Sequence, residues 1–259
     1  MYAPSISASY SKVAQVTAVF WVLKIIATTL GEMSGDYLAQ TLNLGYWAGL
    51  GITSVLLIGI VGAQWRMTEF HTARFWAAIV ATTTVGTEIS DLMDRTLGLG
   101  YTGGSVILFA GLVITLLIWQ RREGNLSIYP ITHKPAELLF WTAVLFSNSL
   151  GTAFGDFLVD VIGLSYMQGA MVTMGVIGVV MALHRFTTVS HVTLFWVAFV
   201  FTRPFGATFG DFLTKPMVKG GLDLGTLQAS AVALVLMAII VTLTHRQHTS
   251  RVALRVRNK

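Results

Sequence analysis

The sequence predicts an all-α, polytopic membrane protein, and two observations carry this prediction. Of its 259 residues, 54% are hydrophobic and only 11% are charged, whereas soluble globular proteins carry about 25% charged residues. The apolar residues also form long blocks and do not alternate with polar ones, unlike the strands of an outer-membrane barrel. This composition excludes a water-soluble enzyme, a disordered chain and, with no cysteine present, a secreted domain built on disulfides.

One sequence unit occurs four times along the chain. Each copy begins with a Phe-Trp pair, and a glycine lies 11 residues after the Phe, a small residue 15 after it and an aspartate 16 after it. The Phe residues that begin the copies are Phe20, Phe75, Phe140 and Phe195. A short turn and a second apolar run follow each aspartate, with an insertion in the fourth copy. Each unit is therefore expected to be a helix pair, an a-helix and a b-helix, joined by a turn.

The helices are expected to span the membrane. The a-helices are predicted at 13–40, 73–95, 136–161 and 190–214, and the b-helices at 46–64, 101–119, 165–184 and 225–244. Each is long enough to cross a hydrocarbon core of about 30 Å. Two spans per unit make the copies parallel, not inverted. We expect a single transmembrane domain over 1–259 with eight transmembrane helices, arranged as repeats 13–65, 70–120, 135–185 and 190–245 and a basic cytoplasmic tail, 246–259.

The positions of the basic residues predict the orientation. Twelve of the 17 lysines and arginines lie before the first span, in the b-to-a loops or in the C-terminal tail. By the positive-inside rule both termini are cytoplasmic. Lipid headgroups are a sufficient reason for the net charge of +5, so no nucleic-acid partner is predicted.

Polar residues at four-residue spacing form a seam along each a-helix, and no b-helix has such a seam. Charged groups that face lipid are costly, so the seams are expected to face one another. This predicts an inner ring of four polar-seamed helices inside an apolar layer of four b-helices. Small residues beside the seams are expected to let the helices pack closely: Gly31, Gly35, Gly86, Gly151, Gly155, Gly206 and Gly210.

The seams supply the candidate binding residues. The candidate ion-binding set consists of carboxylates and one amide: Asp36, Asp91, Asp156, Asp211, Glu32, Glu88 and Asn148. The candidate metal ligands are the four repeated aspartates: Asp36, Asp91, Asp156 and Asp211. Such oxygen ligands suit hard ions such as Mn²⁺, Mg²⁺ or Ca²⁺. Lys24 and Arg203 lie near mid-span and are candidate counter-ions or coupling residues, and Glu32 and Glu88 are candidate proton carriers.

These residues also have a structural interpretation. In it, the repeated aspartates cap the following helix or pair with Arg95 or Lys215. Lys24 then forms an ion pair with Glu32 or Glu88. The sequence leaves both interpretations open.

The fourfold F-W…G-x-x-x-G-D unit resembles a bacterial family of uncharacterised membrane-anchored proteins built from a repeat of unknown function. The resemblance covers roughly residues 15–245. It implies a multi-pass protein of the bacterial inner membrane. It supplies no substrate, so the function has to be argued from the residues.

The sequence favours a transporter of a small cation, with efflux of a divalent metal such as Mn²⁺ in first place and protons as a coupled substrate. Three alternatives stay open: a cation channel, a transporter of a small organic ion, and a structural or partner-binding membrane protein. No H-E-x-x-H or G-x-S-x-G motif occurs, so neither an enzyme nor a cofactor is predicted. The lipid bilayer is the expected partner, and a homo-oligomer is left open.

Overall fold

A computed structural model describes residues 11–67 and 70–257, with side chains as far as His245. Within these ranges the chain contains eight α-helices, three π-helical segments and one short 3-10 helix, and no strand. The prediction of an all-α chain is therefore confirmed.

Each repeat contributes one a-helix and one b-helix. The a-helices are α1 (Ala18–Asp36), α3 (Thr72–Asp91), α5 (Lys134–Asp156) and α7 (His191–Thr214). The b-helices are α2 (Gly45–Arg66), α4 (Gly100–Glu123), α6 (Tyr166–Phe186) and α8 (Thr226–Arg257). Among the described residues, seven of these helices are long and apolar enough to cross a membrane, and α3 is the exception.

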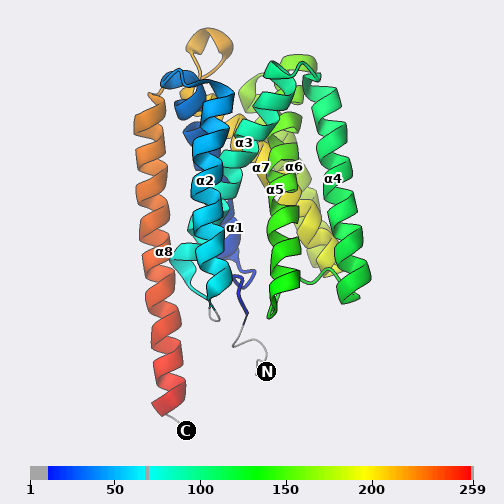
Figure 1. The fold of residues 1–259 in the computed structure, drawn as a ribbon, viewed down its shortest axis with the longest axis vertical. Coiled ribbons are helices and arrows are strands. Elements are labelled where there is room, and N and C mark those ends of the chain that lie inside the picture. Colours follow the sequence, from blue (N-terminus) through cyan, green and yellow to red (C-terminus); the bar gives the residue numbers. More distant parts are fainter. Residues whose placement is uncertain (1–10, 68–69, 258–259) are drawn as a thin grey trace.

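The a-helices form a closed ring in the order α1, α3, α5, α7, in which each helix packs along two neighbours. The b-helices lie outside this ring, and each covers the a-helix of the next repeat: α2 packs on α3, α4 on α5, α6 on α7, and α8 returns to pack on α1. The described chain begins and ends at one end of the bundle, here called the terminus end, and the a-to-b turns lie at the opposite turn end (Figure 1). The four copies thus hold one another in a circle.

Glycines set the spacing within the ring. The first glycine of each copy faces the residue eight positions after the Phe of the next copy; the pairs are Gly31 with Thr83, Gly86 with Asn148, Gly151 with Arg203 and Gly206 with Thr28. A Cβ built on Gly31 would lie 2.0 Å from Thr83 Oγ1. At the next small residues, an added Cβ would lie 3.0 to 3.4 Å from the nearest atom of the following helix: Gly35, Gly155 and Gly210. Larger side chains at the first-glycine positions would push the ring helices apart.

Three a-helices end in a π-helical segment directly after the repeated aspartate: Tyr37–Thr41, Leu92–Thr96 and Phe157–Val161. Hydrogen bonds over five residues close these segments, such as Leu42 N–H to Tyr37 O at 2.8 Å. π-Helical turns occur frequently at functional sites. The periodicity of the sequence does not predict them, since a single wide turn leaves the apolar pattern unchanged.

The two largest differences from the predicted boundaries lie at the ends of the chain. The first helix begins at Ala18 and not at residue 13, because Thr17 caps it by accepting a hydrogen bond from the Phe20 N–H. The segment before Thr17 runs across the terminus end, where Gln64 donates to the Lys12 carbonyl at 3.0 Å. At the other end of the chain, residues 246–257 continue α8 as helix instead of leaving it as a separate tail.

Candidate functional site

The centre of the ring is built in layers, because the four a-helices are parallel and equivalent positions of the copies face one another. The layer nearest the terminus end is the Phe layer: Phe20, Phe75, Phe140 and Phe195. The layer nearest the turn end that all copies share is the Asp layer: Asp36, Asp91, Asp156 and Asp211. Between these two layers the copies carry different residues.

The Phe layer closes the centre toward the terminus end. All four Phe side chains are buried. The rings of Phe20 and Phe195 have centroids 6.2 Å apart, and those of Phe75 and Phe140 are 6.3 Å apart. Trp76 fills the space between copies, with its ring 5.4 Å from that of Phe20. An apolar layer therefore separates the polar centre from the terminus end.

A buried ion pair lies in the part of the chain before α1 and at the start of α5. Lys12 Nζ is 2.5 Å from Glu137 Oε2, and the two side chains are 6% and 1% exposed. The sequence pattern gave neither residue a partner. No local pattern identifies this pair, because 125 residues separate its members.

Lys24 is fully buried and has an amide as its polar partner. Its Nζ donates to Asn148 Oδ1 at 2.9 Å and lies 4.1 Å from the centre of the Phe199 ring. Neither Glu32 nor Glu88 forms the ion pair with Lys24 that the structural interpretation suggested. Glu32 instead forms an ion pair with Arg203 from the neighbouring helix α7.

Arg203 joins three ring helices at the centre of the bundle. Its side chain is fully buried, and Nη2 donates to Glu32 Oε2 at 2.8 Å and to Thr87 Oγ1 at 2.6 Å. Thr87 in turn donates to Glu32 Oε2 at 3.3 Å. A buried charge without a partner is strongly destabilising. Separating α7 from α1 and α3 would leave Arg203 and Glu32 without their partners, so these contacts stabilise the packing of the three helices.

Lys215 gathers one half of the Asp layer. Its Nζ is 2.6 Å from Asp36 Oδ2 and 3.5 Å from Asp211 Oδ1, and Gln40 Oε1 accepts a further hydrogen bond at 3.2 Å. Lys215 follows the last residue of α7 and is 19% exposed. Burial alone would lower the pKa of its ammonium, but the carboxylates of Asp211 and Asp36 raise this pKa above its usual value. Lys215 is therefore a charged side chain that covers two aspartates at the turn end.

Arg95 gathers the other half in the same way. Its Nη2 is 2.9 Å from Asp156 Oδ2, and its Nε is 3.4 Å from Asp91 Oδ1. With 33% of its side chain exposed, Arg95 also lies between the aspartates and the surface. Beside it, Tyr101 donates to Asp160 at 2.6 Å. Copies 2 and 4 thus supply the cations, and each cation bridges to the aspartate of the following copy.

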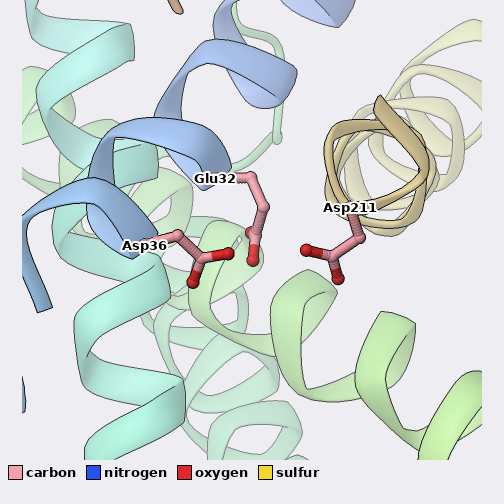
Figure 2. Close-up of side chains that lie close together, drawn as sticks. All are labelled: Glu32, Asp36 and Asp211. Carbon is pink, nitrogen blue, oxygen red and sulfur yellow. The ribbon is translucent and has the colours of Figure 1, made fainter. Parts of the chain in front are cut away.

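Glu32, Asp36 and Asp211 form the three-carboxylate cluster. One oxygen from each lies within 4.8 Å of the others, and all three residues are buried. Figure 2 shows Glu32 and Asp36 extending from α1 toward Asp211 of α7. Asp211 Oδ1 has no hydrogen-bonding partner in the described part of the chain. Carboxylate oxygens at this spacing are suitable ligands for a hard cation.

The structure does not gather the four candidate metal ligands at one point. Asp36 and Asp211 join Glu32 in the three-carboxylate cluster, whereas Asp91 and Asp156 lie apart from it around Arg95. The repeat predicts that the four aspartates share one layer. Lys215 and Arg95 each pair with two of them, and so separate this layer into two halves.

Glu88 lies outside the polar centre. Its carboxylate packs against Gly49 of α2, where an added Cβ would lie 2.5 Å from Oε1. The side chain is fully buried, and neither of its carboxylate oxygens has a hydrogen-bonding partner among the described residues. The Glu88 side chain is therefore directed toward the b-helix α2, and not toward the centre of the ring.

Comparison with protein families gives a match over most of the chain. A family model described as Repeat of Unknown Function (DUF347) matches four times, at residues 19–69, 74–125, 139–190 and 194–250. The resemblance and the fourfold repeat inferred from the sequence are thereby confirmed. Comparison with curated proteins and with solved structures finds no match.

Proposed function

The chain belongs to the Repeat of Unknown Function family, whose description names no activity, and we propose from its own residues that it is a membrane transporter of a small cation. A divalent metal such as Mn²⁺ is the first candidate substrate. The observation that carries this proposal is the three-carboxylate cluster, buried at the turn end of the ring. We propose that it lies in the bacterial inner membrane, as the family resemblance implies, with both termini cytoplasmic, as the distribution of Lys and Arg predicts.

In this proposal α3 is the eighth span. It has fewer apolar residues than the other helices because it carries five threonines besides Arg74, Glu88 and Asp91. It packs against α1, α5, α2 and α8, so protein and not lipid surrounds most of it. A helix enclosed in this way does not need an apolar surface. Together with its π-helical segment it has 25 residues, Thr72–Thr96, enough for about 37 Å.

The charges around the three-carboxylate cluster suit a cation substrate. Three carboxylates share two positive side chains, Arg203 and Lys215. Arg203 is fixed by buried hydrogen bonds, whereas Lys215 is partly exposed and lies beyond the end of α7. We infer that an incoming cation takes the place of the Lys215 ammonium between Asp36 and Asp211. Oxygen ligands alone favour Mn²⁺, Mg²⁺ or Ca²⁺ over Cu⁺ or Zn²⁺.

Alternating access is favoured over an open channel. The Phe layer is buried and continuous across the ring. Lys24 and Arg203 lie fully buried between this layer and the aspartates, where fixed positive charges impede a cation. A cation that passes from the terminus end to the turn end, as efflux requires, therefore needs a rearrangement of the ring.

A second candidate function rests on the ion pairs of the Asp layer. Each of the four aspartates lies within 4.0 Å of Lys215 or Arg95. In this alternative the pairs hold the turn end together and the protein serves as a structural or partner-binding membrane protein. It predicts loss of stability, and no change in ion movement, when the aspartates are neutralised.

Flux measurements on the purified protein in liposomes separate these candidates. We expect saturable Mn²⁺ flux that falls at least about tenfold in the double variant Asp36→Asn/Asp211→Asn, because both substitutions remove a negative ligand. The matched control is Asp160→Asn, which alters an exposed carboxylate outside the cluster. Absence of flux for Mn²⁺, Mg²⁺ and Ca²⁺ in either direction would contradict the transporter, and equal flux in both variants would contradict the site.

A further inference from the structure

Glu88 has an environment that no other described carboxylate shares. Both of its oxygens are buried and without a hydrogen-bonding partner, whereas each other carboxylate with an orphaned oxygen has an ion pair or a hydrogen bond through Oδ or Oε. The residue is fully buried. Its space is provided by Gly49, since a Cβ there would lie 2.5 Å and 2.7 Å from the two carboxylate oxygens.

The charged groups that act on Glu88 are themselves acidic. They are Asp36 and Glu32, both from α1. From α2 it meets Gly49, which brings no charge. Among the described residues, an ionised carboxylate in this position would have no hydrogen-bond donor and no ion-pair partner of its own, and the charged groups that act on it are two carboxylates. Such a group is costly in a low-dielectric region, whereas the protonated acid is neutral.

The repeat itself does not require a carboxyl at this position. The residue 13 positions after the Phe is Met33, Ala153 and Thr208 in the other three copies. In the fourth copy Thr208 lies against Gly169, where an added Cβ would lie 3.1 Å from Thr208 Cγ2, much as Glu88 lies against Gly49. The other copies thus have an apolar or hydroxyl side chain at this position, so the repeat does not account for the acid in copy 2.

From this placement we propose that Glu88 is a proton-binding site, distinct from the three-carboxylate cluster, and that its proton is exchanged for the transported cation. The first part stands without the proposed function, and the second part rests on it. A cation bound between Asp36 and Asp211 cancels negative charge near Glu88 and so favours release of the Glu88 proton to the aqueous phase. By linkage, a proton on Glu88 weakens cation binding by the same factor.

Labelling with dicyclohexylcarbodiimide, an apolar reagent that modifies protonated carboxyl groups within membranes, tests the first part on the full-length protein. We expect mass spectrometry to find Glu88 modified at neutral pH. Glu32 and Glu137 serve as internal controls, because Arg203 and Lys12 hold them as ion pairs, and both should stay unmodified. The Glu88→Gln variant should lose the modification and, in the infrared spectrum, the carbonyl band of a protonated acid. A spectrum unchanged by this substitution, or labelling of Glu32 in preference to Glu88, would overturn the proton site.

Labelling in the presence of Mn²⁺ tests the second part. We expect saturating Mn²⁺ to lower Glu88 modification at least about tenfold, with no such protection by Mn²⁺ in Asp36→Asn/Asp211→Asn. Mn²⁺ that binds without protecting Glu88 would overturn the exchange and leave the cation site in place. Labelled Glu88 in a protein that neither binds nor moves Mn²⁺ would overturn the cation function and leave the proton site.

Discussion

The Phe layer at the terminus end and the charged centre around Arg203 use the same repeat in opposite ways. At the terminus end, the Phe layer has the same residue in all four copies, and the rings pack as an apolar closure. One layer below the aspartates, the copies differ, and a single residue, Glu32, meets the single Arg203. The comparison teaches that residues identical in all four copies form the apolar packing, whereas residues that differ between the copies form the charged centre.

The Asp layer combines residues that are identical in all copies with residues that differ between them. Its four residues are identical, yet only copies 2 and 4 supply a cation, Arg95 and Lys215. A fourfold ring thereby acquires two unequal halves, and only the half around Lys215 includes a third carboxylate, Glu32. This difference is our reason for proposing the cation site in the half around Lys215.

The largest expected effect comes from breaking the charged centre at Arg203. Arg203→Met leaves Glu32 buried without its cation, which costs about 3–5 kcal/mol. The double variant Arg203→Met/Glu32→Gln removes both charges and should recover most of this loss. Thermal unfolding in detergent measures both, and a double variant no more stable than Arg203→Met would contradict the ion pair.

A smaller loss is expected where the copies are alike, at the ring glycines. In Gly206→Ala the new Cβ would lie 2.2 Å from Thr28 Oγ1 and 2.9 Å from the Thr28 backbone carbon. Overpacking of this kind costs about 1–3 kcal/mol. The control is Gly59→Ala on α2, where nothing lies within 4 Å of the added atom. Equal unfolding temperatures for the two variants would show that the ring is not closely packed at this point.

Lys215 distinguishes the two halves of the Asp layer. Lys215→Ala removes the cation that competes for Asp36 and Asp211, and partly exposed pairs contribute roughly 1 kcal/mol, so Mn²⁺ affinity should rise about fivefold. Arg95→Ala should change this affinity less, because Arg95 bridges Asp91 and Asp156. Electron paramagnetic resonance of free Mn²⁺ gives both affinities. An equal rise in both variants would remove the distinction between the halves.

The smallest effect is expected at the margin of the Asp layer. Tyr101→Phe removes the hydrogen bond to Asp160 and should lower stability by no more than about 1 kcal/mol, since both groups are exposed. Mn²⁺ affinity should be unchanged within twofold. A large fall in affinity would extend the site to the Arg95 half.

Much of this architecture could be predicted from the repeat. The eight helices, the parallel copies and the glycines beside the seams all follow from spacing within one unit. The sequence could predict that the repeated aspartates pair with Arg95 or Lys215, as they do. It could not predict which copies each cation joins, because the ring closes copy 4 on copy 1 and brings Lys215 to Asp36 across 179 residues. The direction of Glu88 was also missed, since a helix pattern does not tell which helix covers which face. In the structure each b-helix covers the a-helix of the next copy.

The most direct test of the central claim is the anomalous diffraction of Mn²⁺ in crystals soaked with this ion. The account predicts a peak between the carboxylates of Glu32, Asp36 and Asp211, with the Lys215 ammonium moved away from Asp36. A saturating soak that gives no peak there, or places Mn²⁺ only elsewhere on the protein, would contradict it.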